Sequence, residues 1–203
     1  MADNQYALTA QLRKDTGKGA SRRLRRLQGL VPGIIYGGSA APQQISVKSN
    51  ELKKALENEA FYSHILTLDI EGQSIRAVLK DLQRHPQKSF VIHADFQRIS
   101  DDVEIHMHVP LHFLNEEACV GVKTQGGEIQ HNLVEVEVVC LPKFLPEFIA
   151  VDLADVALNQ IVHMSDLKLP EGVKLTALIH HDDQPVVSVH ASRVGGGEET
   201  PAA

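Results

Sequence analysis

The sequence predicts a mainly β protein with two parts, a small closed or nearly closed N-terminal β-barrel with short helices and a second β-rich domain. Its apolar segments are short and alternate with polar residues, which is typical of half-buried strands joined by turns. Charge divides the 203 residues unevenly. Residues 1–98 carry 15 Lys and Arg against 9 Asp and Glu, whereas residues 99–203 carry 5 against 17. A basic half joined to an acidic half indicates two domains with different partners.

The first half contains the strands that we expect to form the barrel. Residues 5–13 alternate apolar and polar side chains, as a strand with one buried face does. Further strands are expected at residues 34–36, 44–47, 64–71, 74–82 and 89–96, with glycine turns at residues 37–39 and 72–73. A helix is expected to begin at Ser49 or Asn50, ahead of apolar residues at helical spacing.

Between the first two strands lies a strongly basic segment, GKGASRRLRRLQG, which predicts a short helix. Ser21 is expected to cap its N-terminus, because a hydroxyl can accept from a free backbone N–H of the first turn. Ala20, Leu24 and Leu27 recur at i, i+4 and i+7 and predict one apolar face. Gly29 fits the left-handed residue that follows a helix. The arginines repel one another, so this helix is costly without an anionic partner.

The polar residues 99–102 mark the expected boundary between the two halves. We expect one domain over residues 1–98, an acidic β domain over residues 99–192 and a disordered polar tail over residues 193–203. Strands of the second domain are expected at residues 103–113, 133–141, 173–179 and 185–191, the last two as a pair, with a loop at residues 121–127.

Composition argues against several classes of protein. Cys119 and Cys140 form no C-x-x-C pattern, which favours a reducing compartment and buried thiols. No apolar run reaches the roughly 18 residues of a membrane span, and the N-terminus lacks the layout of a signal peptide. We therefore expect a soluble cytoplasmic protein with no membrane partner.

Neither catalysis nor metal binding is indicated by the motifs. The sequence has no G-x-S-x-G, no P-loop and no H-E-x-x-H, so no enzyme activity and no cofactor are expected. Histidines gather within residues 106–112 and in the cluster at residues 180–183. Neither group has the ligand spacing of a zinc site, so no metal is expected.

Two groups of residues suggest contact with nucleic acid. The cation density of the basic segment favours RNA or DNA over a merely solvated face, since arginine donates to phosphate or guanine in a rigid fork. Downstream of QRHP, His93 and Asp95 lie two apart on a strand and share a face. They either read base edges, with the Asp accepting from a guanine amino group, or form an ordinary strand end beside a surface His. From the residues alone the second interpretation is favoured.

Four motifs, GKGASRRLRR, VPGIIYGG, DLQRHP and HADFQRI, carry a resemblance. With them the chain closely resembles the bacterial large-subunit ribosomal proteins that bind 5S ribosomal RNA, in the long two-domain form also called the general stress protein Ctc. The resemblance covers the whole chain, although its distinctive motifs lie in residues 1–98. It implies an N-terminal six-stranded β-barrel with short helices, followed by a second β-rich domain. The barrel is expected to dock on the loop E region of 5S RNA, in a widened minor groove.

The resemblance also implies which residues contact RNA, and it reverses the interpretation of the His-Asp pair. The positions that carry over are Arg13, Lys18, Ser21, Arg22, Arg25, Tyr36, His93 and Asp95. Arg23 and Arg26 are added as phosphate contacts. The segment between Arg25 and Pro32 is one residue longer than in the short single-domain form.

The partners implied are 5S rRNA, the large ribosomal subunit and neighbouring ribosomal proteins, with a monomer off the ribosome. The acidic domain is expected to avoid RNA and to face solvent or a basic ribosomal protein. The alternative function is a stress-related protein-interaction module that acts through this C-terminal domain.

Overall fold

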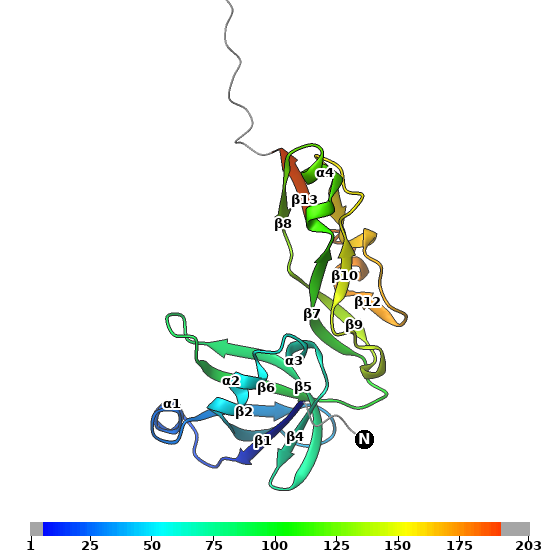
Figure 1. The fold of residues 1–203 in the computed structure, drawn as a ribbon. Helices are drawn as coiled ribbons and strands as arrows, with labels where there is room; N and C mark the ends of the chain where they lie inside the picture. Colours follow the sequence, from blue (N-terminus) through cyan, green and yellow to red (C-terminus); the bar gives the residue numbers. More distant parts are fainter. Residues whose placement is uncertain (1–5, 192–203) are drawn as a thin grey trace, which may run out of the picture. The chain divides into compact units, whose positions relative to one another are not determined.

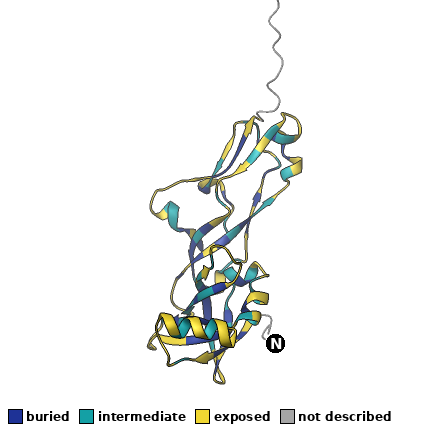
Figure 2. Ribbon diagram, turned by 90° about the vertical axis from the view of Figure 1, so that its left-hand side faces the viewer, coloured by how far each residue is buried: buried dark blue, intermediate teal, exposed yellow. Residues whose placement is uncertain are grey.

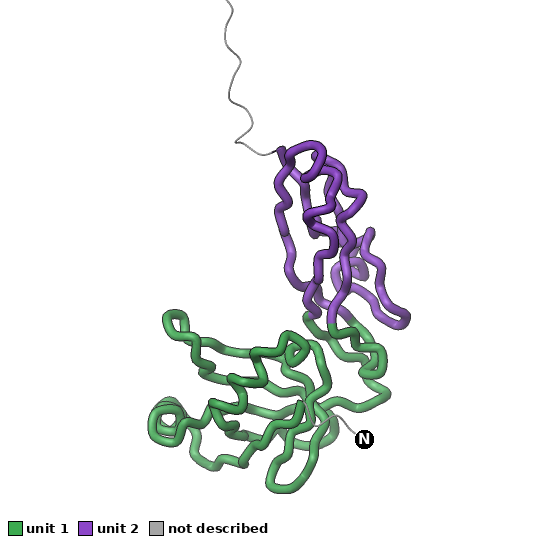
Figure 3. Tube along the Cα trace, viewed as in Figure 1, with its two compact units in different colours: residues 1–108, 139–147 green, residues 109–138, 148–203 purple. Residues whose placement is uncertain are grey.

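The computed structural model describes residues 6–191, whose fold is shown in Figure 1. The chain divides into two compact units, residues 1–108 with 139–147 and residues 109–138 with 148–203 (Figure 3). Two of the limits between the units fall within strands, residues 105–114 and 135–140, and the segment of residues 139–147 belongs to the first unit. The predicted domain limits stay a prediction, and the predicted tail lies outside the described residues.

Six strands of the first unit close into a barrel, which confirms the predicted mainly β fold and the strand number. Around the barrel the order is β1, β3, β2, β6, β5 and β4. Their bounds are Ala7–Leu12 (β1), Leu30–Tyr36 (β2), Gln43–Lys48 (β3), Leu66–Ile70 (β4), Gln73–Arg84 (β5) and Val91–Arg98 (β6). Neighbours are antiparallel except that β1 pairs with β4, and β2 with β6, in parallel. Closure leaves this sheet without an exposed edge.

Alternation along these strands fills the barrel with aliphatic side chains. Ile35, Ile45 and Leu68 are fully buried in its core. Two short helices add to this core, α2 (Ser49–Ala55), which begins where predicted, and α3 (Ala60–Ser63). They contribute Leu52 and Phe61, both fully buried. Each such side chain stabilises the fold by about 1.5–3 kcal/mol relative to an exposed one.

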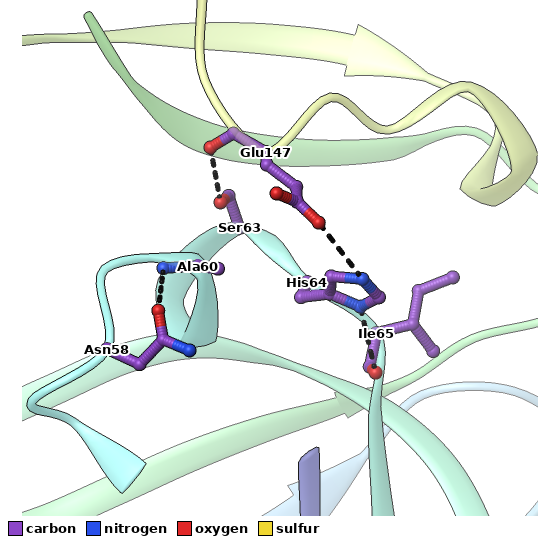
Figure 4. A network of polar contacts seen from close by, with 6 residues as sticks. All are labelled: Asn58, Ala60, Ser63, His64, Ile65 and Glu147. Atoms are coloured by element: carbon purple, nitrogen blue, oxygen red, sulfur yellow. Dashed lines mark hydrogen bonds and ion pairs between the residues drawn. The ribbon is translucent and has the colours of Figure 1, made fainter. Parts of the chain in front are cut away.

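The segment of residues 139–147, which belongs to the first unit, contacts α3 at its end (Figure 4). The Ser63 hydroxyl donates to the backbone O of Glu147 at 2.7 Å. The Glu147 carboxylate lies 3.6 Å from Nε2 of His64, whose ring stacks on Tyr6 with a centroid distance of 4.4 Å. The buried hydroxyl of α3 thus obtains its acceptor from a residue far away in the sequence.

The basic segment forms one continuous helical stretch, α1 (Lys18–Arg23) followed by the π-helical turn η2 (Leu24–Gln28). Gly29 ends it in the left-handed conformation, at φ 62°, as predicted. The predicted N-cap was wrong. Helix α1 begins directly after Gly17, whose φ of 94° suits a glycine, and Ser21 lies inside the helix.

The predicted apolar face of this helix was only partly right. Ala20 and Leu24 are half-buried, but Leu27 is 80% exposed. The π-helical turn takes more residues per turn than an α-helix, so the i, i+4, i+7 spacing no longer keeps one face toward the barrel. Figure 2 shows this helix on the outside of the barrel, exposed along most of its length.

The strands after the barrel form two further sheets, which confirms the second β-rich part. The first sheet has the order β10, β7, β9, β12, and the second β11, β13, β8. The strands are Ile105–Leu114 (β7), Gly127–His131 (β8), Glu135–Cys140 (β9), Ile149–Asp152 (β10), Ile161–His163 (β11), Val173–Leu175 (β12) and Pro185–Ala191 (β13). The short helices are Glu116–Ala118 (η3), Val120–Lys123 (α4), Pro142–Phe144 (η4), Met164–Asp166 (η5) and Thr176–Ile179 (α5).

Two local predictions in this part were wrong. The predicted loop at residues 121–127 includes part of α4. The predicted final strand pair does not form, because β12 ends at Leu175 and the chain continues as α5. There the backbone satisfies its hydrogen bonds locally, with His180 N donating to Thr176 O at 3.2 Å. Strand β13 pairs instead with β8 and β11.

The thiols of Cys119 and Cys140 are buried and unbridged, as expected. Within the described part of the chain, the helices are too short or too polar for any of them to cross a membrane.

Candidate nucleic-acid interface

The basic helix exposes most of its cations. Lys18, Arg22, Arg23 and Arg26 are exposed, and Arg25 is half-buried. The first turns of α1 and η2 contain no acidic residue. Neighbouring guanidinium groups repel one another, and a cation in the first turn opposes the helix dipole. An anion such as phosphate lying over the helix would remove this repulsion.

Arg25 ties the helix to β6. Its Nη1 donates to the carbonyl O of Ile92 at 3.3 Å. Ile92 is the extra residue of a β-bulge between Val91 and His93, where the register between β5 and β6 shifts. A bulged residue lacks a direct partner in the ladder, so its carbonyl is open to a side-chain donor. Arg25 therefore holds the basic helix beside the residue that precedes His93.

Arg13, which directly follows β1, connects β3 to Ser21 of the same helix. Its backbone N donates to Gln44 O at 3.0 Å, and its Nη1 lies 3.3 Å from Asp15 O and 3.4 Å from Ser21 Oγ. Among the described residues its buried Nε has no hydrogen-bond partner. In the free protein Arg13 and Ser21 thus contact each other and position the helix entry.

A groove of about 620 Å³ lies between the basic helix and the start of β6. It is lined by Lys18, Arg22, Arg25, Arg26, Leu30, Val31, Ser49, His85, Lys88, Phe90, Val91 and Ile92. No carboxylate is among these lining residues of the described chain. Arg13 and Arg23 line a second groove, of about 340 Å³, with Asp15 as its one acidic side chain. The helix therefore has cation-lined grooves on two sides, and we refer to the larger one as the basic groove.

A different kind of surface lies on the outside of β6. His93 and Asp95 share a face, as predicted, and His93 Nδ1 lies 2.6 Å from Asp95 Oδ1. The two side chains are 26% and 30% exposed, so a ligand can reach both. When Nδ1 carries the proton and donates to Asp95, Nε2 is left as an acceptor. The pair then presents acceptors to a ligand, in contrast to the donors of the basic groove.

Two residues of β5 join this face. Gln83 belongs to the QRHP segment that the sequence placed with His93 and Asp95, whereas the sequence pattern did not indicate Asp81. In the ladder Asp81 lies opposite Asp95, and Gln83 lies opposite His93. A bulge between Leu79 and Asp81 shifts the in–out alternation of β5 by one residue, which turns both polar side chains outward. The segment DLQRHP was the available signal, but strict alternation from the buried Leu79 would have put Asp81 inside the barrel.

Tyr36 ends β2 on the neighbouring side of β6, opposite Gln97. Partial burial raises the pKa of its phenol above the usual 10.0, and the negative charges of Asp95 and Asp81 raise this pKa further. The phenol therefore stays protonated at neutral pH and can donate. We refer to Tyr36, His93 and Asp95 with their neighbours Asp81 and Gln83 as the acceptor cluster.

Over residues 6–191 no three His, Cys, Asp or Glu side chains gather closely enough to hold a metal ion.

The predicted RNA contacts lie in three places. Four of them line the basic groove: Lys18, Arg22, Arg25 and Arg26. Three lie at or beside the second groove, Arg13, Ser21 and Arg23, and three lie on the barrel face, Tyr36, His93 and Asp95.

Comparison with known proteins accounts for both halves of the chain. A family model described as the ribosomal L25p family matches residues 8–96. A second, described as the C-terminal domain of ribosomal protein TL5, matches residues 104–193. The large ribosomal subunit protein bL25 of Alcanivorax borkumensis is 62% identical over 193 residues, which cover 94% of this chain and 90% of the relative. The chain belongs to the ribosomal L25p family.

Other bL25 proteins are similar over nearly the same length. That of Hahella chejuensis is 57% identical over 198 residues, covering 97% of this chain and 95% of the relative. That of Pseudomonas aeruginosa is 57% identical over 189 residues, covering 93% of each chain. Because both family models match, the chain is the long two-domain form. Members of the L25p family are structural ribosomal proteins and not enzymes, which agrees with the prediction from the motifs.

Proposed function

We propose that this L25p-family chain is a structural protein of the large ribosomal subunit that binds the loop E region of 5S rRNA through residues 1–98. The names of its relatives, large ribosomal subunit proteins, support the subunit assignment. The observation that carries the RNA proposal is the Arg25–Ile92 hydrogen bond, which holds a cation-lined groove next to a cluster of acceptors. Cations suit phosphates, and acceptors suit base edges.

Affinity comes from the basic helix. Lys18, Arg22, Arg23 and Arg26 are exposed and contact phosphates, whereas Arg25 and the Arg13–Ser21 pair mainly position the helix. Each phosphate contact releases condensed counterions, so binding weakens as salt rises. Tight binding at low salt that falls steeply with salt is therefore expected.

Selectivity comes from the acceptor cluster. A carboxylate repels phosphates, so Asp95 has a favourable partner only where a base presents a donor. In the minor groove that donor is the guanine amino group. In the tautomer that donates from Nδ1 to Asp95, Nε2 of His93 is a second acceptor beside it. The Tyr36 phenol supplies a donor for a base or a 2′-hydroxyl. The wide, shallow minor groove of RNA admits such a surface.

The acidic part, over residues 99–192, has a different role in this proposal. Its charge would be repelled by RNA, so it faces solvent or a basic protein of the subunit. RNA affinity is accordingly expected to depend on residues of the first unit alone.

The test compares two variants of the full chain on a loop E hairpin and on a scrambled hairpin, at several salt concentrations. Arg22→Ala should weaken binding to both RNAs and reduce the salt slope by about one unit. Asp95→Ala should reduce the preference for loop E by about 1–3 kcal/mol, because it removes the acceptor for the base, while leaving the slope unchanged. Arg76→Ala and Asp102→Asn are the controls for charge, because neither residue lines the basic groove or belongs to the acceptor cluster. An Asp95→Ala protein with the wild-type preference for loop E would refute the assigned role of Asp95.

A further inference from the structure

The hairpin loop between β5 and β6, residues 85–90, is locally well ordered by hydrogen bonds. His85 N donates to Phe90 O at 3.0 Å and closes the loop. The backbone N–H groups of Gln87 and Lys88 both point at Nδ1 of His85, at 3.2 and 3.3 Å. This nitrogen therefore acts as an acceptor, and the imidazole helps to fix the path of the loop.

The loop holds an aromatic ring at the surface. The rings of His85 and Phe90 pack with centroids 4.7 Å apart and planes inclined by 39°. His85 is half-buried, whereas Phe90 remains 40% exposed. The tilted His85 ring restrains the ring of Phe90 on one side and leaves apolar surface open on the other. Such a restrained, exposed ring suits a planar ligand.

Phe90 lies where two cation-bearing grooves meet. It lines the basic groove and also a groove of about 420 Å³ that includes Lys53 and Arg84. Ser49 and Val91 are the other residues common to both grooves. Glu57, in the smaller groove, is the one carboxylate lining either of them within the described chain. The surroundings of the ring therefore favour a ligand that is both planar and anionic.

We propose that Phe90 is a stacking platform for an unpaired base of the RNA held by the basic helix. Lys88, on the same loop, and Lys53, in the adjoining groove, contact the flanking phosphates. A base within a duplex has no free face, so the occupant is an unpaired or extruded nucleotide. Stacking on an aromatic ring tolerates any base, and this site therefore adds affinity without selecting sequence. The inference rests on the proposed RNA-binding function and extends its surface beyond the barrel face.

The first measurement uses the absence of Trp from this sequence. In Phe90→Trp the new indole is the only one in the chain, and it keeps an aromatic platform. We expect wild-type affinity for 5S rRNA and a decrease of indole fluorescence on binding. Phe144→Trp is the matched control, because Phe144 is 47% exposed but lines neither groove. Its fluorescence should not change.

The second measurement separates stacking from charge. Phe90→Leu keeps an apolar side chain without a planar face and should weaken 5S rRNA binding about tenfold with an unchanged salt slope. Lys88→Ala should lower the slope by about one unit. Unfolding curves in urea check that each variant is folded.

The outcomes distinguish failure of the Phe90 platform from failure of the proposed RNA-binding function. If wild type binds 5S rRNA but Phe90→Leu binds equally well and the Phe90→Trp signal is constant, the platform is refuted and the RNA-binding function stands. If Phe90→Leu binds RNA normally but fails to enter the large subunit, the ring contacts a protein instead. If wild type does not bind 5S rRNA, the proposed function itself fails.

Discussion

Substitution of Gly33 by alanine tests whether the barrel holds the acceptor cluster in place. Gly33 lies in β2 opposite Ala94 of β6 and is buried. A Cβ added there would lie 2.7 Å from the backbone O of Ala94, whereas ordinary contacts begin near 3.4 Å. The obstacle is a strand backbone, which cannot rotate away as a side chain can. The two strands must therefore separate, which costs about 1–3 kcal/mol as an overpacked core site does.

This displacement also has a predicted effect on the acceptor cluster, since Ala94 lies between His93 and Asp95. Moving its backbone shifts both side chains relative to the basic helix. We expect Gly33→Ala to lower the urea midpoint and to reduce the preference for loop E RNA, and both are measured on the full chain.

Gly19→Ala is the matched control for this substitution. Its Cβ would meet only the end of the Arg23 side chain, at 3.5 Å, and its φ is not positive. Because alanine favours a helix, stability should stay equal or rise by up to about 1 kcal/mol. If Gly33→Ala unfolds at the wild-type urea concentration, or if Gly19→Ala loses as much stability as Gly33→Ala, then the close packing of β2 against β6 does not hold the acceptor cluster in place.

Three further predictions follow from the same geometry. Asp95→Asn should lower the pKa of the Tyr36 phenol, measured by NMR titration, because one of the carboxylates that raise this pKa is gone. An unchanged Tyr36 titration in the variant would contradict the influence of Asp95. In wild type the stability contributed by Tyr36 is fully present below pH 10 and is lost as pH rises through the folded pKa, because the folded pKa is raised. Arg25→Ala should speed amide hydrogen exchange in α1 and η2, whereas Arg26→Ala should not. Of these two arginines, only Arg25 donates a hydrogen bond to β6 in the described structure. Gly121→Ala should cost about 1–3 kcal/mol in urea unfolding, since its Cβ would lie 2.9 Å from a buried Val of β13, and a wild-type midpoint would argue against this contact.

The barrel could be predicted because strands such as β1 and β4 alternate between more and less buried residues. The His93–Asp95 face followed from a two-residue spacing, and Gly29 followed from the chemistry of helix ends. Asp81 did not follow, because its outward direction depends on a bulge that no local pattern announces. The exposure of Leu27 could not be predicted either, because the sequence does not distinguish a π-helical turn from an α-helical one.

Long-range partners were the other part that the sequence did not reveal. The Ser63 hydroxyl is satisfied by Glu147, and the Arg25 guanidinium by Ile92, each far away in the chain. Arginine density indicated a nucleic-acid partner for the basic segment, and the family resemblance implied which of its residues contact RNA. The fold distinguishes Arg25 and Arg13, which hold the helix, from the exposed Arg22, Arg23 and Arg26.

Attachment of the helix by Arg13 at its entry and by Arg25 at its other end has a consequence for recognition. Two long side chains are already restrained before binding, which saves about 0.5–1.5 kcal/mol of ordering for each. The separation between the cations and the acceptor cluster is then a property of the barrel and not of the ligand. Under the proposed function, the protein would measure the width of an RNA groove, because a groove too narrow or too wide cannot place a phosphate on the helix and a base donor on Asp95 at once.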